Sequence, residues 1–236
     1  MFSSHSKHFA AGQPPLPAKD SQPIARPIVC YVTDRKALRE KKTVSALLDR
    51  IREAAAAGVD WVQIREKDLP ARELLAVVRD AVALASVRVI VNDRLDVALA
   101  AGAAGVHLGH ASVPAREVVR WYRAGNAPAD FLVGVSCHSL EGAQEAESAG
   151  ASYTYFGPIH ETPSKIPFGK PHGVEELAHV AKAVRIPVIA IGGVNESNAA
   201  ECIRAGAAGI AAIRMIQDAS NVVALKKAIE AIHCSR

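Results

Sequence analysis

The sequence predicts an α/β protein: a (β/α)8 TIM barrel, a single domain with a flexible N-terminal tail. Eight short apolar segments alternate with longer segments of helical pattern, and several of the helical segments close on an Ala-Gly pair directly before the next apolar run. Half of the 236 residues are hydrophobic and 22% are charged, which excludes a disordered chain. A chain of this length fits one barrel domain.

The first 27 residues differ in composition from the rest. They are rich in proline, serine and polar residues and show no hydrophobic periodicity. Such a composition is typical of a flexible tail. We therefore expect a tail at 1–27 and the barrel at 28–236.

Each expected strand is a short, continuous apolar run with many β-branched residues. Such runs indicate strands buried on both faces, as in a parallel sheet. An open doubly wound sheet is the alternative fold, but eight evenly spaced units favour a closed barrel. The expected strands lie at 27–33, 59–64, 87–92, 104–109, 131–136, 152–157, 187–193 and 208–214.

The helical segments carry recognisable end signals. The first one, TVSALLDRIREAAAAG, begins with Thr43, whose hydroxyl suits a helix N-cap. A repeated design follows, in which a helix ends at Ala-Gly and a strand starts at once; glycine suits this place because a positive φ costs it little. The repeats lie at 56–64, 100–108, 148–156 and 204–212.

Charge, cysteine content and hydropathy narrow the function classes. The net charge of +4 comes from scattered residues, with no basic run interleaved with aromatics, so we expect no nucleic-acid partner. No apolar run approaches the roughly 18 residues of a membrane span, and the N-terminus lacks a signal-like apolar region. The four cysteines form no CxxC pair, which favours reduced thiols. We expect a cytoplasmic protein with a small anionic substrate and no membrane partner.

Active sites of such barrels lie where the strands end, and polar residues follow nearly every expected strand. At the second strand end, Gln63, Arg65 and Lys67 recur with period two and so share one face, which we expect to be the barrel interior. Two inward cations need an anion such as a phosphate or carboxylate. Glu66 has the opposite parity and is expected to point outward.

Asn92 and Asp93 end the third expected strand. Asp93 has three alternative roles: it binds Mg²⁺, caps the following helix, or pairs with Arg65 or Lys67. Histidines follow the next two strands, at His107, His110 and His138. A histidine at a barrel mouth can transfer protons near neutral pH. We rank His138 first, because it shares the inward parity of Ser136.

Gly192 and Gly193 end the seventh expected strand and predict a phosphate site. Glycines let backbone amides approach an oxyanion, and the expected helix after Asn195 favours negative charge. The loops after strands seven and eight are the usual phosphate site of barrels. Arg214, at the end of the eighth strand, can add a charge-assisted hydrogen bond.

Six motifs in order resemble the thiamine phosphate synthase and TenI-like thiazole tautomerase superfamily. The resemblance covers about residues 28–233 and implies a (β/α)8 barrel that acts on thiamine precursors. The motifs are QIREK (63–67), VNDRLDVAL (91–99), GVHLGH (105–110), VGVSCHS (133–139), FGPIHETPSK (156–165) and PVIAIGGVN (187–195).

The first hypothesis is a thiazole tautomerase. The pattern LGHxS, here with His110 and Ser112, and CHSL resemble that group. The resemblance implies that a proton shift aromatises a thiazole carboxylate phosphate, with His138 as the acid and base and no metal. Arg65 and Lys67 would hold an anionic end of the substrate, with Asn92 assisting.

The second hypothesis is thiamine phosphate synthase, which joins a pyrimidine pyrophosphate to a thiazole phosphate. The resemblance implies Mg²⁺ on Asp93, and Ser112 replaces the second acidic residue of that group. His107 and Gly157-Pro158 look more like the synthase. Thr162, Ser164 and Lys165 nearly match its phosphate-binding stretch, whereas Arg214 matches neither group.

A metabolite-binding regulator without catalysis is the third hypothesis, and it would act through the 27-residue tail. In all three cases the ligand is a small phosphorylated thiazole, joined in the synthase by a pyrimidine pyrophosphate. A homodimer is compatible with the sequence.

Overall fold

The computed structural model describes residues 26–39, 42–84, 86–161 and 170–235. The expected tail therefore lies outside the described residues, apart from its last two. Arg26 pairs with Asp60 at 2.7 Å, and Pro27 is buried against the barrel.

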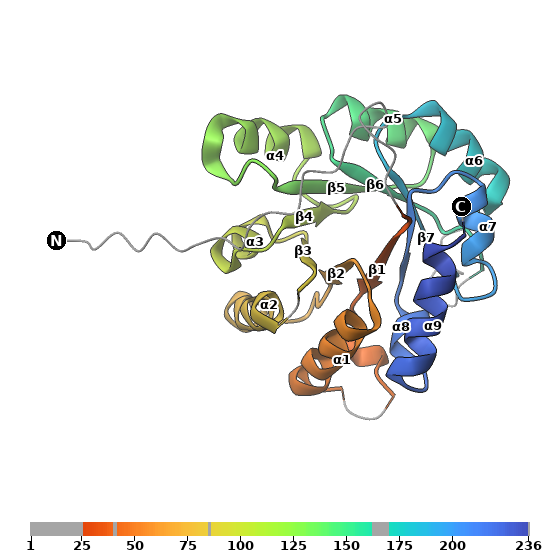
Figure 1. Ribbon diagram of the computed structural model, residues 1–236. Coiled ribbons are helices and arrows are strands. Elements are labelled where there is room, and N and C mark those ends of the chain that lie inside the picture. Colours follow the sequence, from red (N-terminus) through yellow and green to blue (C-terminus); the bar gives the residue numbers. More distant parts are fainter. Residues whose placement is uncertain (1–25, 40–41, 85, 162–169, 236) are drawn as a thin grey trace.

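The eight strands are parallel and close into a barrel in chain order, with β1 pairing β8 (Figure 1). This confirms the predicted (β/α)8 fold and excludes the open sheet. All eight expected segments contain a strand, and the differences are confined to their ends. The strands are β1 (Ile28–Val32), β2 (Trp61–Ile64), β3 (Arg88–Asn92), β4 (Gly105–Leu108), β5 (Leu132–Cys137), β6 (Tyr153–Phe156), β7 (Val188–Ile191) and β8 (Gly209–Ala212).

Helices surround the ring of strands, as Figure 1 shows. They include a 3-10 turn, η1 (Arg35–Ala37), after β1, and a π-helical turn, η2 (Tyr122–Asn126), after α4. The α-helices are α1 (Val44–Ala57), α2 (Ala71–Leu84), α3 (Leu95–Ala101), α4 (Ala115–Trp121), α5 (Leu140–Ser148), α6 (Gly173–Ala183), α7 (Ala199–Arg204), α8 (Arg214–Gln217) and α9 (Val222–His233).

The predicted helix signals are confirmed. Thr43 caps α1, and its hydroxyl accepts a hydrogen bond from the amide of Ala46 at 3.2 Å. The glycines of the four Ala-Gly repeats all have φ between +70° and +102°, which is the left-handed conformation that ends a helix. They are Gly58, Gly102, Gly150 and Gly206.

Two hydrophobic cores fill the molecule. The larger one lies between the outer faces of the strands and the helices, with Leu47, Ile51 and Leu177 fully buried. The smaller one fills the barrel interior, where Tyr153 and Tyr155 are its bulkiest members together with Trp61. The interior is therefore packed with side chains, and the open end of the barrel is left for polar groups.

No disulfide is formed by the cysteines. Cys30, Cys137 and Cys202 are buried thiols and Cys234 is an exposed one, in agreement with the predicted reduced state. Burial raises the pKa of Cys30 to about 12 and that of Cys202 to about 11. None of the helices within the described ranges combines the length and hydropathy needed to cross a membrane.

Candidate active site at the carboxyl ends of the strands

Amide and carboxylate side chains form a chain across the ends of β2 and β3. Gln63 Nε2 donates to Asn92 Oδ1 at 3.1 Å, and Asn92 Nδ2 donates to Asp93 Oδ2 at 2.7 Å. Gln63 is 2% exposed, and its Oε1 atom accepts no hydrogen bond from any described residue. A buried acceptor of this kind favours a ligand that brings a donor to it.

Asp93 has a strained backbone and a carboxylate that accepts hydrogen bonds on both oxygens. Its φ of +61° is rare for a residue other than glycine. Oδ1 accepts hydrogen bonds from the hydroxyl of Ser112 and from the amide of Gly109 at 3.3 Å. Ser112 itself accepts from the Gly109 amide at 2.6 Å. The loop after β4 is thus clasped to the end of β3.

The structure decides against two of the three roles expected for Asp93. Arg94, rather than Asp93, is the N-cap residue of helix α3, and among the described residues it makes no side-chain capping bond. The Asp93 carboxylate is turned toward the β4 loop. Asp93 also makes no ion pair with Arg65 or Lys67 in the part of the chain that the structure describes. Metal binding is the role that stays open.

His107 is a buried, neutral histidine inside the barrel. It is 2% exposed, its Nε2 lies 2.8 Å from Ser136 Oγ, and its Nδ1 lies 3.2 Å from the Tyr153 hydroxyl. Burial lowers its pKa to about 3, which the charge of Asp93 only partly opposes. The ring also lies 4.0 Å from that of Tyr155. His107 therefore orients Ser136 and stays uncharged at neutral pH.

His138 follows β5 and is exposed at the mouth. Its Nδ1 contacts the carbonyl oxygen of Gly157. A carbonyl only accepts, so Nδ1 carries the proton, and Nε2 is the basic nitrogen of the neutral ring. That arrangement suits proton transfer through Nε2.

His172 is a functional candidate that the sequence reasoning missed. It precedes α6, its ring stacks on that of His138 at 6.5 Å and 15°, and it also contacts Phe156. Burial, and then the neighbouring His138, lower the pKa of His172. Its sequence signal, a histidine between Pro171 and a glycine before a helical segment, was too weak to find it.

Gly192 and Gly193 form the turn after β7, with φ of +88° and +70°. A Cβ atom at Gly192 would lie 2.6 Å from Pro158 Cα, and one at Gly193 would lie 2.6 Å from the His160 carbonyl oxygen. Their amides donate to no other described residue. The turn thus offers backbone donors to a ligand anion. Helix α7 begins only at Ala199, several residues after the turn. The predicted phosphate site therefore depends on the glycine amides and not on a helix N-terminus.

The remaining predicted residues are spread around the same mouth. Arg65 is half-buried, Lys67 and His110 are exposed, and Arg214 is exposed at the first turn of α8, just beyond the end of β8. Glu66, which was expected to point outward, is buried and contacts Thr33 and Arg35. The predicted phosphate ligands Thr162, Ser164 and Lys165 lie outside the described residues.

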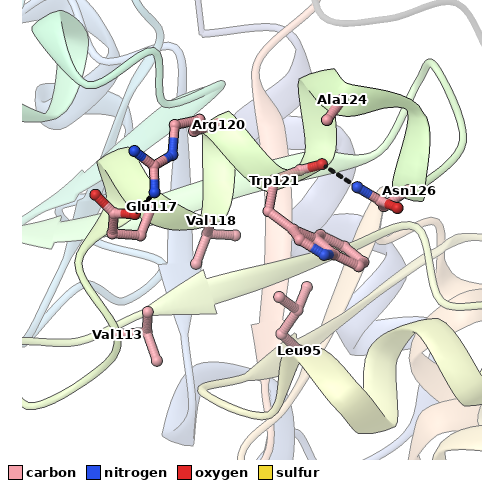
Figure 2. Close-up of a pocket in the computed structure, with 8 residues that line it drawn as sticks. All are labelled: Leu95, Val113, Glu117, Val118, Arg120, Trp121, Ala124 and Asn126. Carbon is pink, nitrogen blue, oxygen red and sulfur yellow. Dashed lines mark hydrogen bonds and ion pairs between the residues drawn. The ribbon is translucent and has the colours of Figure 1, made fainter.

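Two further features bear on ligands. Within the described ranges, no group of three or more His, Cys, Asp or Glu residues is arranged to hold a metal ion. A groove of about 470 Å³ lies on the outside of the barrel between α3 and α4, beside Leu95 and Trp121 (Figure 2). None of the predicted site residues lines it, so the strand ends remain the candidate active site.

A family model described as thiamine monophosphate synthase matches residues 29–216. The chain belongs to the thiamine monophosphate synthase family. This confirms the resemblance in the motifs and the place of the chain in thiamine biosynthesis.

Individual relatives of this family match between 72% and 94% of the chain. The thiamine-phosphate synthase of Roseiflexus sp. (strain RS-1) is 42% identical over 228 residues, which is 94% of this chain and 93% of the relative. The putative thiamine-phosphate synthase of Geobacter sulfurreducens is 46% identical over 173 residues, 72% of this chain and 79% of the relative. Both names give thiamine-phosphate synthase, a transferase. It is the second of the two enzymes expected from the motifs.

A solved structure supports the same assignment. The thiamine phosphate pyrophosphorylase from Pyrococcus furiosus superposes with a TM-score of 0.74 at 31% identity, and the match covers 89% of this chain and 98% of that one. The barrel fold is thus shared with a solved enzyme of this family. The chain is an enzyme of thiamine biosynthesis.

Proposed function

We propose that the chain is a thiamine phosphate synthase, which joins a pyrimidine pyrophosphate to a thiazole phosphate and releases pyrophosphate. The observation that carries this proposal is the similarity to enzymes of that name over 94% of the chain. The geometry agrees with it, because the Gln63 amide oxygen, the Asp93 carboxylate and two cations all lie at the carboxyl ends of β2 and β3.

The substrates of such a reaction match the groups at the mouth. Gln63 Oε1, which accepts no hydrogen bond within the described part of the chain, suits a ring substituent that donates one. Arg65 and Lys67 suit the pyrophosphate, whose negative charge increases as it departs. The amides of Gly192 and Gly193 suit the phosphate of the thiazole.

Mg²⁺ fits this site through one carboxylate. Magnesium sites that act on phosphates commonly use one or two carboxylates, with phosphate oxygens and water completing the shell. Asp93 supplies one carboxylate, and Ser112 places a hydroxyl beside it where a second carboxylate is absent. When bound, the ion would offset the charge of the departing pyrophosphate.

The second candidate is the thiazole tautomerase, which a specific observation favours. The Asp93 carboxylate already accepts hydrogen bonds from Ser112, Gly109 and Asn92. His138, meanwhile, presents a basic Nε2 at the mouth, as a proton shift requires. In this reaction the same cations and glycine amides would bind the carboxylate and the phosphate of the substrate.

A coupling assay decides between the two. Purified protein is mixed with the pyrimidine pyrophosphate, thiazole carboxylate phosphate or thiazole phosphate, and Mg²⁺, and thiamine phosphate is measured. For a synthase we expect turnover that chelation abolishes and that Asp93→Asn reduces about a hundredfold. Asp96→Asn, an exposed carboxylate paired with Arg94, is the matched control and should retain activity.

Two variants sharpen the outcome. Ser112→Asp adds a second carboxylate and should lower the Mg²⁺ concentration at half-maximal rate. His138→Gln should slow a synthase about tenfold or less, but a tautomerase by about a hundredfold or more. Turnover of the thiazole tautomer by the wild type, with no thiamine phosphate formed beside an active control synthase, would replace the first proposal by the second.

A further inference from the structure

The segment after β2 that carries Arg65 and Lys67 is held by a buried carboxylate, that of Glu66. Glu66 is 4% exposed and lies between the two cations in the sequence. Its parity turns the side chain away from the barrel interior, toward the turn η1 that follows β1. Its contacts therefore concern the backbone that presents the cations rather than the ligand itself.

Thr33 connects this carboxylate to the end of β2. The Thr33 amide donates to the Gln63 carbonyl at 2.9 Å, as expected where parallel strands pair. The next step of such a ladder would join the Arg65 amide to the Thr33 carbonyl; instead, the Arg65 amide donates to Thr33 Oγ1 at 2.9 Å. The threonine side chain thus continues the β1–β2 ladder by one step after β1 has ended.

That hydroxyl needs an acceptor for its own proton, and Glu66 supplies it. Thr33 Oγ1 donates to Glu66 Oε1 at 2.7 Å, and Thr33 is fully buried. The Arg35 amide donates to the same carboxylate at 3.1 Å, and Arg35 Nη1 donates to Oε2 at 3.2 Å. All these partners are donors, so the arrangement suits a carboxylate, which only accepts. Arg35 compensates its buried charge.

We propose that Glu66 is a positioning residue for anion binding: acting through Thr33, it holds the Arg65 backbone so that Arg65 and Lys67 face the mouth. The inference rests on the proposed function in taking pyrophosphate as the anion. Loss of the Thr33 hydroxyl removes the acceptor of the Arg65 amide. An amide in place of the Glu66 carboxylate sets a donor against the donors of Arg35 or Thr33, so that Thr33 is held less firmly. The cations then bind the anion from a less ordered strand end, at an entropic cost.

The test measures binding of inorganic pyrophosphate by calorimetry, well below the melting temperature of each variant. Thr33→Val keeps the side-chain shape but removes the hydroxyl, and Glu66→Gln keeps the shape but removes the charge. We expect each to weaken binding about tenfold, in the range seen when groups supporting a ligand-binding residue are lost. Arg65→Met shows how much pyrophosphate affinity is lost when one of the two cations is itself absent.

Two variants separate positioning from a general loss of stability. Thr33→Ser retains the hydroxyl and should bind as the wild type does. Asp68→Asn removes the other carboxylate that holds Arg35, at 2.7 Å, but it does not contact Thr33. It should lower the melting temperature slightly and leave the affinity within twofold. In steady state, Thr33→Val and Glu66→Gln should raise KM for the pyrophosphate substrate more than they lower kcat.

The outcomes distinguish this inference from the function on which it rests. Wild-type affinity in both Thr33→Val and Glu66→Gln would overturn the positioning role, as would a wild type that binds no pyrophosphate. An equal loss in Asp68→Asn would overturn it too, because Arg35 alone would then explain the effect. Normal pyrophosphate binding without any thiamine phosphate formation would overturn the proposed function and leave the positioning role supported.

Discussion

Single residues at the barrel mouth are held by partners from neighbouring strands. Ser136 is oriented by His107, the Asp93 carboxylate is oriented by Ser112, and the His138 ring is oriented by the Gly157 carbonyl. Such partners restrict the rotamers of reactive groups before a ligand arrives, which is how a site reaches a productive geometry without reorganisation. The mouth is thus preorganised by hydrogen bonds from side chains and from one backbone carbonyl.

The buried state of His107 predicts how the free energy of unfolding depends on pH. Its pKa is about 3 in the folded chain, below the ordinary value of 6.5. Between these values the unfolded chain binds the extra proton, so this group's contribution is complete above pH 6.5 and is lost as the pH falls toward 3. The slope is up to about 1.4 kcal/mol per pH unit.

Urea unfolding of the wild type and of His107→Gln at pH 7.5 and pH 4.5 checks this. The free-energy difference between the two proteins should be larger at pH 7.5, because the variant lacks the group that titrates. The difference between the two proteins cancels the contributions of the other titrating groups, which both proteins share. A difference that is equal at the two pH values would contradict the neutral, buried state of His107.

At the scale of elements, glycines decide where helices end and how closely strands approach. Gly102 ends α3 with φ of +70°, and a Cβ atom there would meet nothing within 4 Å. Gly105, at the start of β4, has no such freedom, because a Cβ atom there would lie 2.4 Å from the Leu132 carbonyl oxygen of β5. One glycine is required by its conformation and the other by the space between strands.

Alanine substitutions should therefore differ in cost at these two glycines. Gly102→Ala meets only the left-handed backbone penalty, about 1 kcal/mol of unfolding free energy. Gly105→Ala pushes β4 away from β5, and we expect a loss of about 3 kcal/mol or an insoluble protein. Thermal and urea unfolding measure both. Similar small losses in the two variants would show that the barrel yields more easily than the close approach indicates.

For the whole molecule, the carboxylate of Asp60 connects segments from the beginning and the end of the described barrel. Asp60 precedes β2 and accepts hydrogen bonds from the Val29 amide at 2.8 Å and from Arg26 at 2.7 Å. His233 of α9, the last helix, contacts the same carboxylate at 3.0 Å. One carboxylate thus joins the first strand, the second strand and the C-terminal helix.

Asp60→Ala should destabilise the whole fold, because it leaves the Val29 amide and the side chains of Arg26 and His233 without this acceptor. We expect a loss of about 2 kcal/mol in the free energy of unfolding. Asp49→Ala is the control, because Asp49 forms an exposed ion pair with Arg52. It should change the free energy of unfolding by about 0.5 kcal/mol or less. A loss in Asp60→Ala no larger than that of the control would show that the contacts between the chain ends add little.

The elements and the mouth were predictable because their signals are local. Buried parallel strands appear as continuous apolar runs, and Ala-Gly pairs mark the helix ends, so strand number and order follow from the sequence. Parity then places Gln63 and Asn92 on the inner face, where the structure joins them. These inferences need only neighbours a few positions apart in the chain.

The sequence by itself determined the barrel, the end of the barrel that carries the polar residues, and the family motifs. Only the tertiary structure decided that Asp93 is clasped by Ser112 rather than capping α3, that Glu66 is buried against Thr33, and that His172 stacks on His138. The physical reason is that each of these contacts joins residues far apart in the chain. Their distances depend on strand register and loop path, which periodicity does not specify.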